Sequence, residues 1–318
     1  MTQETAASGQ PDGMSLADLR GGGKGQLARA LARLERAPDA PDTHALMDAA
    51  YADPTAHVIG LTGPPGVGKS SLLARLLRRF RQDGRSVGVI AVDPSSRRSR
   101  GALLGDRLRL LSDPADSGLF VRSMAARDRL GGLAELTMGA AVLMRAVFDV
   151  VVIETVGVGQ SETDVAGAAD TVVFCVQPGS GDSLQFMKAG IVEIPDIAVV
   201  TKADTGAPAN RALADLNSAL SLNDVGPDAW RVRTLAVSAE TGSGVGDLVD
   251  ALAAHDAWLA DAGRRDALRR DQAETWLREA VRDRFGRDGL RRAGTLTLAP
   301  GESPFARMAA VAAALGRD

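Results

Sequence analysis

The sequence predicts an α/β fold built on a mainly parallel β-sheet. Apolar runs typical of buried strands alternate with segments of helical periodicity along most of the chain. The runs lie at residues 58–61, 86–92, 118–122, 149–154, 170–177, 196–200 and 231–237, and the helical segments include 130–148 and 244–259. This alternation predicts right-handed βαβ units, and polar motifs follow the strand ends, where an open α/β sheet binds its ligands.

The segment 57–79 joins a strand, a glycine-rich turn and an amphipathic helix. The turn reads Gly63-Pro-Pro-Gly-Val-Gly-Lys69-Ser70, the G-x-x-x-x-G-K-[ST] signature of a phosphate-binding loop. Its glycines let the backbone fold around a polyphosphate, Lys69 supplies positive charge, and the Ser70 hydroxyl suits Mg²⁺. The sequence therefore predicts a nucleoside triphosphate site formed by Gly63, Pro64, Pro65, Gly66, Val67, Gly68, Lys69, Ser70 and Ser71.

Composition limits the other classes of function. The chain has 318 residues, 45% hydrophobic residues and 3% aromatic residues, which predicts a core of Leu, Val and Ala. Its net charge of −3 gives no pull toward nucleic acid or anionic membrane, and we expect neither as a partner. A single cysteine, Cys175, excludes an internal disulfide, and no segment reads as a signal peptide or a membrane span. We expect a cytoplasmic protein.

We expect four parts along the chain. Residues 1–14 are a disordered tail, 15–50 a helical arm, 51–261 the nucleotide-binding domain and 262–318 a helical C-terminal arm. The glycine run at 21–25 resembles a phosphate loop but follows no strand, so it is interpreted as a flexible joint. The C-terminal arm is predicted to hold an arginine-rich helix, a turn through Gly286 and Gly289, and a helix over 304–315. We expect it to bury little by itself and to pack on the core or on a second copy.

Three features between residues 90 and 180 bear on the site. Glu154 ends the apolar run 149–154, where a Walker B acid holds Mg²⁺; the alternative is an acid that caps the next turn. The basic run 95–109 is either a solvated loop or a mobile segment that meets the triphosphate. Cys175, flanked by apolar residues, is expected to fill the core.

Two downstream motifs indicate guanine. Thr201-Lys202-Ala203-Asp204 and Ser238-Ala239-Glu240 each follow a predicted strand. The Asp204 carboxylate can accept from the N1–H and amino groups of guanine, whereas adenine presents the wrong donors. Lys202 would pack along the base, and the backbone of 238–240 would donate to its oxygen. Thr201 stands where Asn is common, so weaker base affinity is expected. The alternative is a surface lysine and aspartate with no base to read.

The acid of the predicted Walker B motif is followed by Gly157 and Val158, without the glutamine that orients water in Ras-like proteins. Gln160 lies farther along. The interval between Gly63 and Glu154 also leaves room for an extra strand and helices. We predict slow basal hydrolysis that a partner or a dimer contact raises.

Several long stretches together resemble the MeaB/ArgK family of SIMIBI-class P-loop GTPases over about residues 27–260. They are GPPGVGKSS, AVDPSS with LLGDRLR, VRSMAARDRLGGLA, VVIETVGVGQSE, QPGSGDSLQFMKAGIVEIPDIAVVTKAD and SAETGSGV. The resemblance implies a GTP-dependent chaperone. Such a protein gates adenosylcobalamin delivery from an adenosyltransferase and protects an acyl-CoA mutase of the methylmalonyl-CoA mutase type. It also implies a homodimer formed through the C-terminal arm.

The same resemblance implies roles for individual residues. Mg²⁺ would lie among Ser70, Asp93, Asp106 and Glu154, and the catalytic set would be Lys69, Asp93, Glu154 and Lys188. Switch I would span 93–109, switch II 154–162 with Gly157, and switch III 177–190 with Asp182. GTP or GDP is the implied ligand. The chain departs from the family pattern at Thr201, at the basic segment SSRRSRG and at Arg127-Asp128.

Two alternatives remain at this stage. One is a nickel or metal-cluster insertion GTPase of the same class, which would need a cysteine-rich motif or a histidine tract. This chain offers Cys175 and three scattered histidines, His44, His57 and His255, which are expected to be surface or helix residues. The other is a kinase or ATPase associated with amino-acid transport, for which we find no separate acceptor site or base.

Overall fold

The computed structural model describes residues 13–94, 115–126, 135–155, 164–179, 195–221, 226 and 228–316, with the backbone alone at 93, 94, 125, 126 and 135. Its centre is a seven-stranded sheet in the order β3-β2-β4-β1-β5-β6-β7. The strands are β1 His57–Thr62, β2 Val87–Pro94, β3 Leu119–Ala126, β4 Val150–Thr155, β5 Thr171–Val176, β6 Ile197–Val200 and β7 Arg233–Ala236. Every described pairing is parallel, which confirms the predicted sheet.

Helices cover both faces of the sheet because side chains alternate along each strand. On one face, Val58 and Val151 belong to a core shared with α2 Gly23–Arg36, α3 Pro41–Ala52 and α6 Glu135–Arg145. On the other face, Ile59 and Val152 pack in a core with α4 Lys69–Gln82 and α10 Val245–Ala260. The strands β1, β4, β5 and β6 are buried at every residue, as expected of central parallel strands.

The predicted N-terminal helical segment is three helices. The short α1 Leu16–Gly21 precedes α2, and Gly22 separates them, so the glycine run does form a joint between helices. Leu27, Leu31 and Leu34 are buried against α6, which confirms the apolar face inferred from their spacing.

Beyond β6, the short helices η3 Ala203–Thr205 and α9 Ala207–Leu220 lead to β7, and η4 Asp261–Gly263 joins α10 to the C-terminal arm. A further short helix, η1 Val165–Gly167, lies between β4 and β5. None of the described helices combines the length and the apolar character needed to cross a bilayer.

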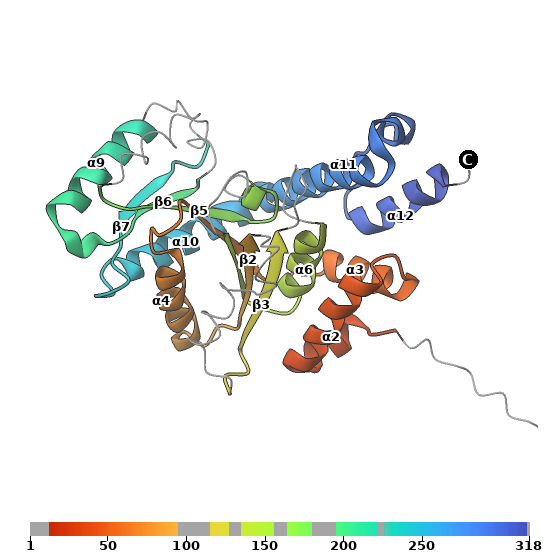
Figure 1. Cartoon of the computed structure of the whole chain (residues 1–318), viewed down its shortest axis with the longest axis horizontal. Coiled ribbons are helices and arrows are strands. Elements are labelled where there is room, and N and C mark those ends of the chain that lie inside the picture. The colour runs from red at the N-terminus through yellow and green to blue at the C-terminus, as the bar shows by residue number, and fades with distance from the viewer. Residues whose placement is uncertain are drawn as a thin grey trace, which may run out of the picture.

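The C-terminal arm consists of α11 Arg264–Ala293 and α12 Pro304–Leu315 (Figure 1). A break at Gly286, whose φ is 69°, confirms one predicted turn residue, but Gly289 lies in the helix after it. The expectation that the arm buries little by itself is wrong. Leu296 and Leu298 follow α11 and close a small core between the two helices, because residues two apart in an extended segment face the same side.

The expectation that the histidines are surface or helix residues is wrong for His57 alone, since His44 and His255 lie in helices. His57 lies in the central strand β1 and His255 in α10, and both are buried. Each ring approaches the Thr171 hydroxyl, with His57 Nε2 at 2.6 Å and His255 Nδ1 at 2.7 Å. A polar partner on β5 therefore contacts one nitrogen of each ring inside the fold, which their positions in the sequence do not reveal.

Candidate functional site

The phosphate-loop motif forms the turn between β1 and α4, as predicted. Gly63, Gly66 and Gly68 have φ of 133°, 77° and 102°, a region that favours glycine. Gly63 also has no room for a side chain, since a Cβ there would lie 2.2 Å from the carbonyl oxygen of Cys175. The glycines therefore set both the path of the loop and its close approach to β5.

Lys69 is the first residue of α4 and is buried. Its Nζ donates to the carbonyl oxygens of Gly63, at 2.5 Å, and Pro64, at 2.9 Å. The loop thus holds the ammonium group beside its own backbone, at the helix N-terminus that also favours an anion. Burial raises the pKa of the nearby Cys175 thiol to about 12, so this cysteine is an inert core residue, as expected.

A hydroxyl and a carboxylate meet beside the loop. Ser70 Oγ donates to Glu154 Oε1 at 2.7 Å, and Glu154 is the penultimate residue of β4. The pairing of β1 with both β4 and β5 places the ends of these strands side by side. Hydroxyl and carboxylate oxygens are ligands that Mg²⁺ prefers, so the pair fits that ion. Among the described residues, no group of three or more His, Cys, Asp or Glu side chains could hold a metal.

The second polar cluster lies at the ends of β6 and β7. Ser238 Oγ donates to Asp204 Oδ1 at 2.5 Å, and this hydrogen bond lowers the pKa of the Asp204 carboxyl. Lys202 has a left-handed backbone, with φ of 55°, and its Nζ donates to Gly66 O at 3.3 Å and to Gln177 Oε1 at 2.5 Å. The two motifs proposed to read the base are therefore in contact with each other and with the phosphate loop.

Thr201 connects the cluster to the phosphate loop. Its hydroxyl lies 2.6 Å from the carbonyl oxygen of Val67 and 2.9 Å from that of Val176. Its sequence position predicts only a substitute for Asn with weaker base affinity. In the structure its hydroxyl bridges the loop and β5, a role that needs one oxygen and no amide.

Arg75 supports the site although no motif of the sequence includes it. From the second turn of α4 its Nε donates to Ala239 O at 2.6 Å and its Nη2 to Glu240 O at 2.5 Å. These bonds fix the 238–240 loop against the helix that begins in the phosphate loop. No signal distinguished Arg75, because α4 also carries Arg78, Arg79 and Arg81.

Several proposed site residues lie outside the described residues. They are Asp106, Gly157, Asp182 and Lys188, together with most of the three proposed switch segments. Asp93 is described only by its backbone, near the end of β2. The structure brings together Gly63, Lys69, Ser70, Glu154, Thr201, Lys202, Asp204 and Ser238 at one edge of the sheet.

Comparisons with known proteins agree with this geometry. A family model described as "Methylmalonyl Co-A mutase-associated GTPase MeaB" matches residues 27–291. A putative GTPase of Pyrococcus abyssi is 43% identical over 232 residues, 71% of this chain and 70% of that protein. A probable GTPase of Mycobacterium tuberculosis is 39% identical over 278 residues, 86% of this chain and 82% of that protein. A crystal structure titled LAO/AO transport system kinase, 27% identical, superposes with a TM-score of 0.65 over 95% of this chain and 96% of its own. This last similarity confirms the predicted fold class.

Proposed function

Since the chain belongs to the MeaB family of GTPases, we propose that it gates the loading of adenosylcobalamin into a cobalamin-dependent acyl-CoA mutase and protects that enzyme. The chain is a P-loop GTPase, and the family description, which names methylmalonyl-CoA mutase, carries the finer proposal. The client would be an enzyme of the methylmalonyl-CoA mutase type. An adenosyltransferase that supplies the cofactor is a further proposed partner.

Hydrolysis of GTP needs little covalent chemistry from the protein, so positioning and charge do most of the catalytic work. The geometry supports this role for Lys69, whose ammonium group is held by two carbonyls beside the loop that would surround the phosphates. The backbone amides of the loop and the start of α4 would bind the same phosphates. We assign Asp93 and Lys188 to the catalytic set by resemblance to the family.

The proposed magnesium site contains Ser70 and Glu154, supported by their 2.7 Å contact. Asp93 and Asp106 complete the proposed set. When bound, Mg²⁺ supplies positive charge that neutralises phosphate oxygens. The protein's own contribution is to aim the Ser70 hydroxyl and the Glu154 carboxylate at one point, which they reach from different elements of the fold.

The selection of guanine is assigned to Asp204. Its lowered pKa keeps the carboxylate ionised, and an ionised carboxylate accepts two hydrogen bonds, as the N1–H and amino groups of guanine require. Ser238 orients one oxygen, while Arg75 holds the carbonyls of the loop whose amides would face the guanine oxygen. Loss of either support should weaken guanine binding without altering the phosphate loop.

The proposed regulation is slow basal turnover, because no glutamine directly follows Gly157. We further propose that the arm 262–318 mediates a homodimer. Isolated protein that turned over GTP at about ten per second or faster would contradict the proposed regulation alone.

The decisive experiment is affinity capture from cell lysate with the tagged full chain in GTP, in GDP and without nucleotide. We expect an adenosylcobalamin-dependent mutase to be retained in a nucleotide-dependent manner and identified by mass spectrometry. Lys69→Ala, which removes the charge at the phosphate loop, should lose the nucleotide dependence, while Arg78→Ala on the exposed side of α4 should keep it. Failure to enrich any cobalamin enzyme in all three states would refute the proposed client.

A further inference from the structure

A cavity of about 170 Å³ lies at the other edge of the sheet from the phosphate loop. It is formed where the N-terminal end of β1, the end of α4, the part of α10 from Val249 to Ala260 and the start of α11 meet. A cavity of about 150 Å³ is large enough for benzene, so this one admits a molecule of similar size.

Most of the cavity wall is apolar. Ile59, Phe80, Val249 and Leu252 line its inner part, and exposed alanines of α10, including Ala257, line it toward solvent. Such a wall favours a hydrocarbon body over a cluster of water molecules.

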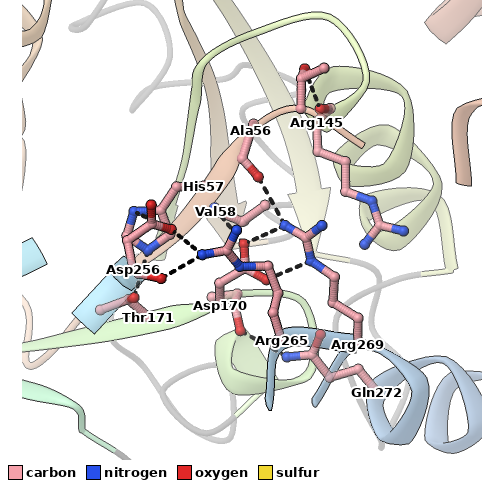
Figure 2. A network of polar contacts seen from close by, with 12 residues as sticks. Ala56, His57, Val58, Arg145, Asp170, Thr171, Asp256, Arg265, Arg269 and Gln272 are labelled. Carbon is pink, nitrogen blue, oxygen red and sulfur yellow. Dashed lines mark hydrogen bonds and ion pairs between the residues drawn. The ribbon is translucent and has the colours of Figure 1, made fainter. Parts of the chain in front are cut away.

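The polar groups in the wall carry an excess of positive charge. Arg265 Nη2 donates to Asp256 Oδ1 at 2.7 Å, and Asp256 also lies 3.5 Å from His57 Nδ1 (Figure 2). That single carboxylate is thus already paired. Burial lowers the pKa of His57, so its ring is neutral at physiological pH and adds no charge.

Two donors remain available for an anion. Arg85 forms no ion pair within 4 Å among the described residues, although its charge helps to lower the pKa of Asp149. Its guanidinium lies over the Phe80 ring, 5.7 Å from the centroid, and makes one long contact of 3.4 Å to Asp149 O. The Nε of Arg265 is buried, and within the described part of the chain it has no hydrogen-bond partner. A buried donor without an acceptor is costly, and an anionic oxygen would satisfy it.

We propose that this cavity binds a short-chain monocarboxylate, with its hydrocarbon body against the α10 and α4 side chains and its carboxylate between Arg85 and Arg265. One negative charge balances the excess of one positive charge, and the size of the cavity restricts the body to a few carbons. The site is separate from the nucleotide residues, which lie at the opposite ends of β1 and α4.

The test uses the full chain labelled at its Ile, Leu and Val methyl groups and titrated with sodium butyrate, with sodium chloride and butyramide as matched probes. We expect saturable shifts at Ile59, Val249 and Leu252 with butyrate, with a Kd of about 1–10 mM for so small a ligand. Chloride carries the negative charge without a hydrocarbon body, so it tests whether charge alone causes the shifts. Butyramide carries the hydrocarbon body without a charge, so it tests whether the body alone causes them. Equal responses to either probe, or no saturable shift with butyrate, would overturn the proposal.

Substitutions locate the site. Arg85→Gln should weaken butyrate binding about tenfold, because it removes a charge-assisted hydrogen bond. Ala257→Phe, at an exposed helical position in the cavity wall, should block binding without disturbing the core. Arg78→Gln, on α4 but outside the cavity, should bind as the wild type does. GDP affinity should be unchanged in all three, which shows that they are folded; unchanged butyrate affinity in Arg85→Gln would refute the assignment.

Discussion

The buried ion pair between Asp170 and Arg269 anchors the C-terminal arm to the sheet, and replacing Arg269 by methionine should strongly destabilise the protein. Arg269 Nε donates to Asp170 Oδ1 and Nη2 to Oδ2, both at 2.7 Å, and Nη2 also donates to Ala56 O at 2.9 Å (Figure 2). The two side chains are 9% and 2% exposed. Methionine keeps much of the volume but removes all three hydrogen bonds.

The size of the destabilisation in Arg269→Met follows from the Asp170 carboxylate, which remains buried without its ion-pair partner. Without Arg269, Asp170 keeps the backbone N–H of Val58, at 2.8 Å, as its described donor in a buried position. Breaking a buried pair by removing one partner costs about 3–5 kcal/mol of the free energy of unfolding. The double variant Asp170→Asn/Arg269→Met removes both charges of the pair and should recover a large part of that loss.

The pH dependence gives this prediction a second test. Burial raises the pKa of Asp170, but the hydrogen bonds and charge of Arg269 outweigh it and leave the pKa below its usual value. In the wild type this stabilisation is present above the unfolded pKa, about 3.9, and is lost as the pH falls through the folded value. In Arg269→Met the effect of burial dominates, so the pKa of Asp170 in the folded protein rises above its value in the unfolded chain. The free energy of unfolding of this variant therefore increases as the pH falls toward the raised pKa.

Urea denaturation followed by far-UV circular dichroism, at pH 7 and pH 5, measures these differences. We expect the gap between wild type and Arg269→Met to be smaller at pH 5. A loss below about 1 kcal/mol at pH 7 would show that the pair is no better than an exposed one. A gap that widened at pH 5 would refute the assignment of the cost to the buried carboxylate.

Three further predictions concern the site and the histidines. Gly63→Ala should lower GTP affinity at least about tenfold in a fluorescent-nucleotide titration, because its Cβ would meet the neighbouring strand; unchanged affinity would contradict the close approach. Arg75→Met should weaken GDP binding about tenfold in the same titration while Arg78→Met does not, and equal effects would show that Arg75 has no special role. Burial lowers the pKa of His255 to about 4 and raises that of Asp196 to about 6, so their opposite effects on stability nearly cancel between pH 4 and 6.5. In Asp196→Asn only the histidine effect remains, so the free energy of unfolding should fall by about 3 kcal/mol from pH 6.5 to pH 4 in denaturant titrations. The reason is that His255 binds a proton over this range in the unfolded chain but not in the folded one; a flat profile would refute this.

Local chemistry explains which features the sequence could predict. The turn from Gly63 to Ser70 needs particular residue types at fixed spacing, so its pattern indicates both its structure and its ligand. The strands were predictable because buried parallel strands read as continuous apolar runs. The boundaries moved by a few residues, since the ends of an element depend on hydrogen bonds that the pattern does not specify.

Long-range contacts account for what the sequence did not reveal. Arg269 binds Asp170 across 99 positions, and nothing near either residue indicates the other. Arg75 resembles the other arginines of its helix until the fold places the 238–240 loop beside it. His57 and His255 meet only because β1, β5 and α10 pack together around Thr171.

The strand β5 connects two contacts that lie far apart in the structure. Asp170, just before the strand, forms the ion pair with Arg269 of α11. About 17 Å farther along the same extended backbone, the carbonyl group of Cys175 lies against Gly63. An extended strand hydrogen-bonded on both sides resists lengthening, so we expect a displacement at one end to be passed to the other. We therefore expect a protein that displaces α11 to shift the 63–70 loop without contacting it, and a ligand in that loop to alter the position of the arm.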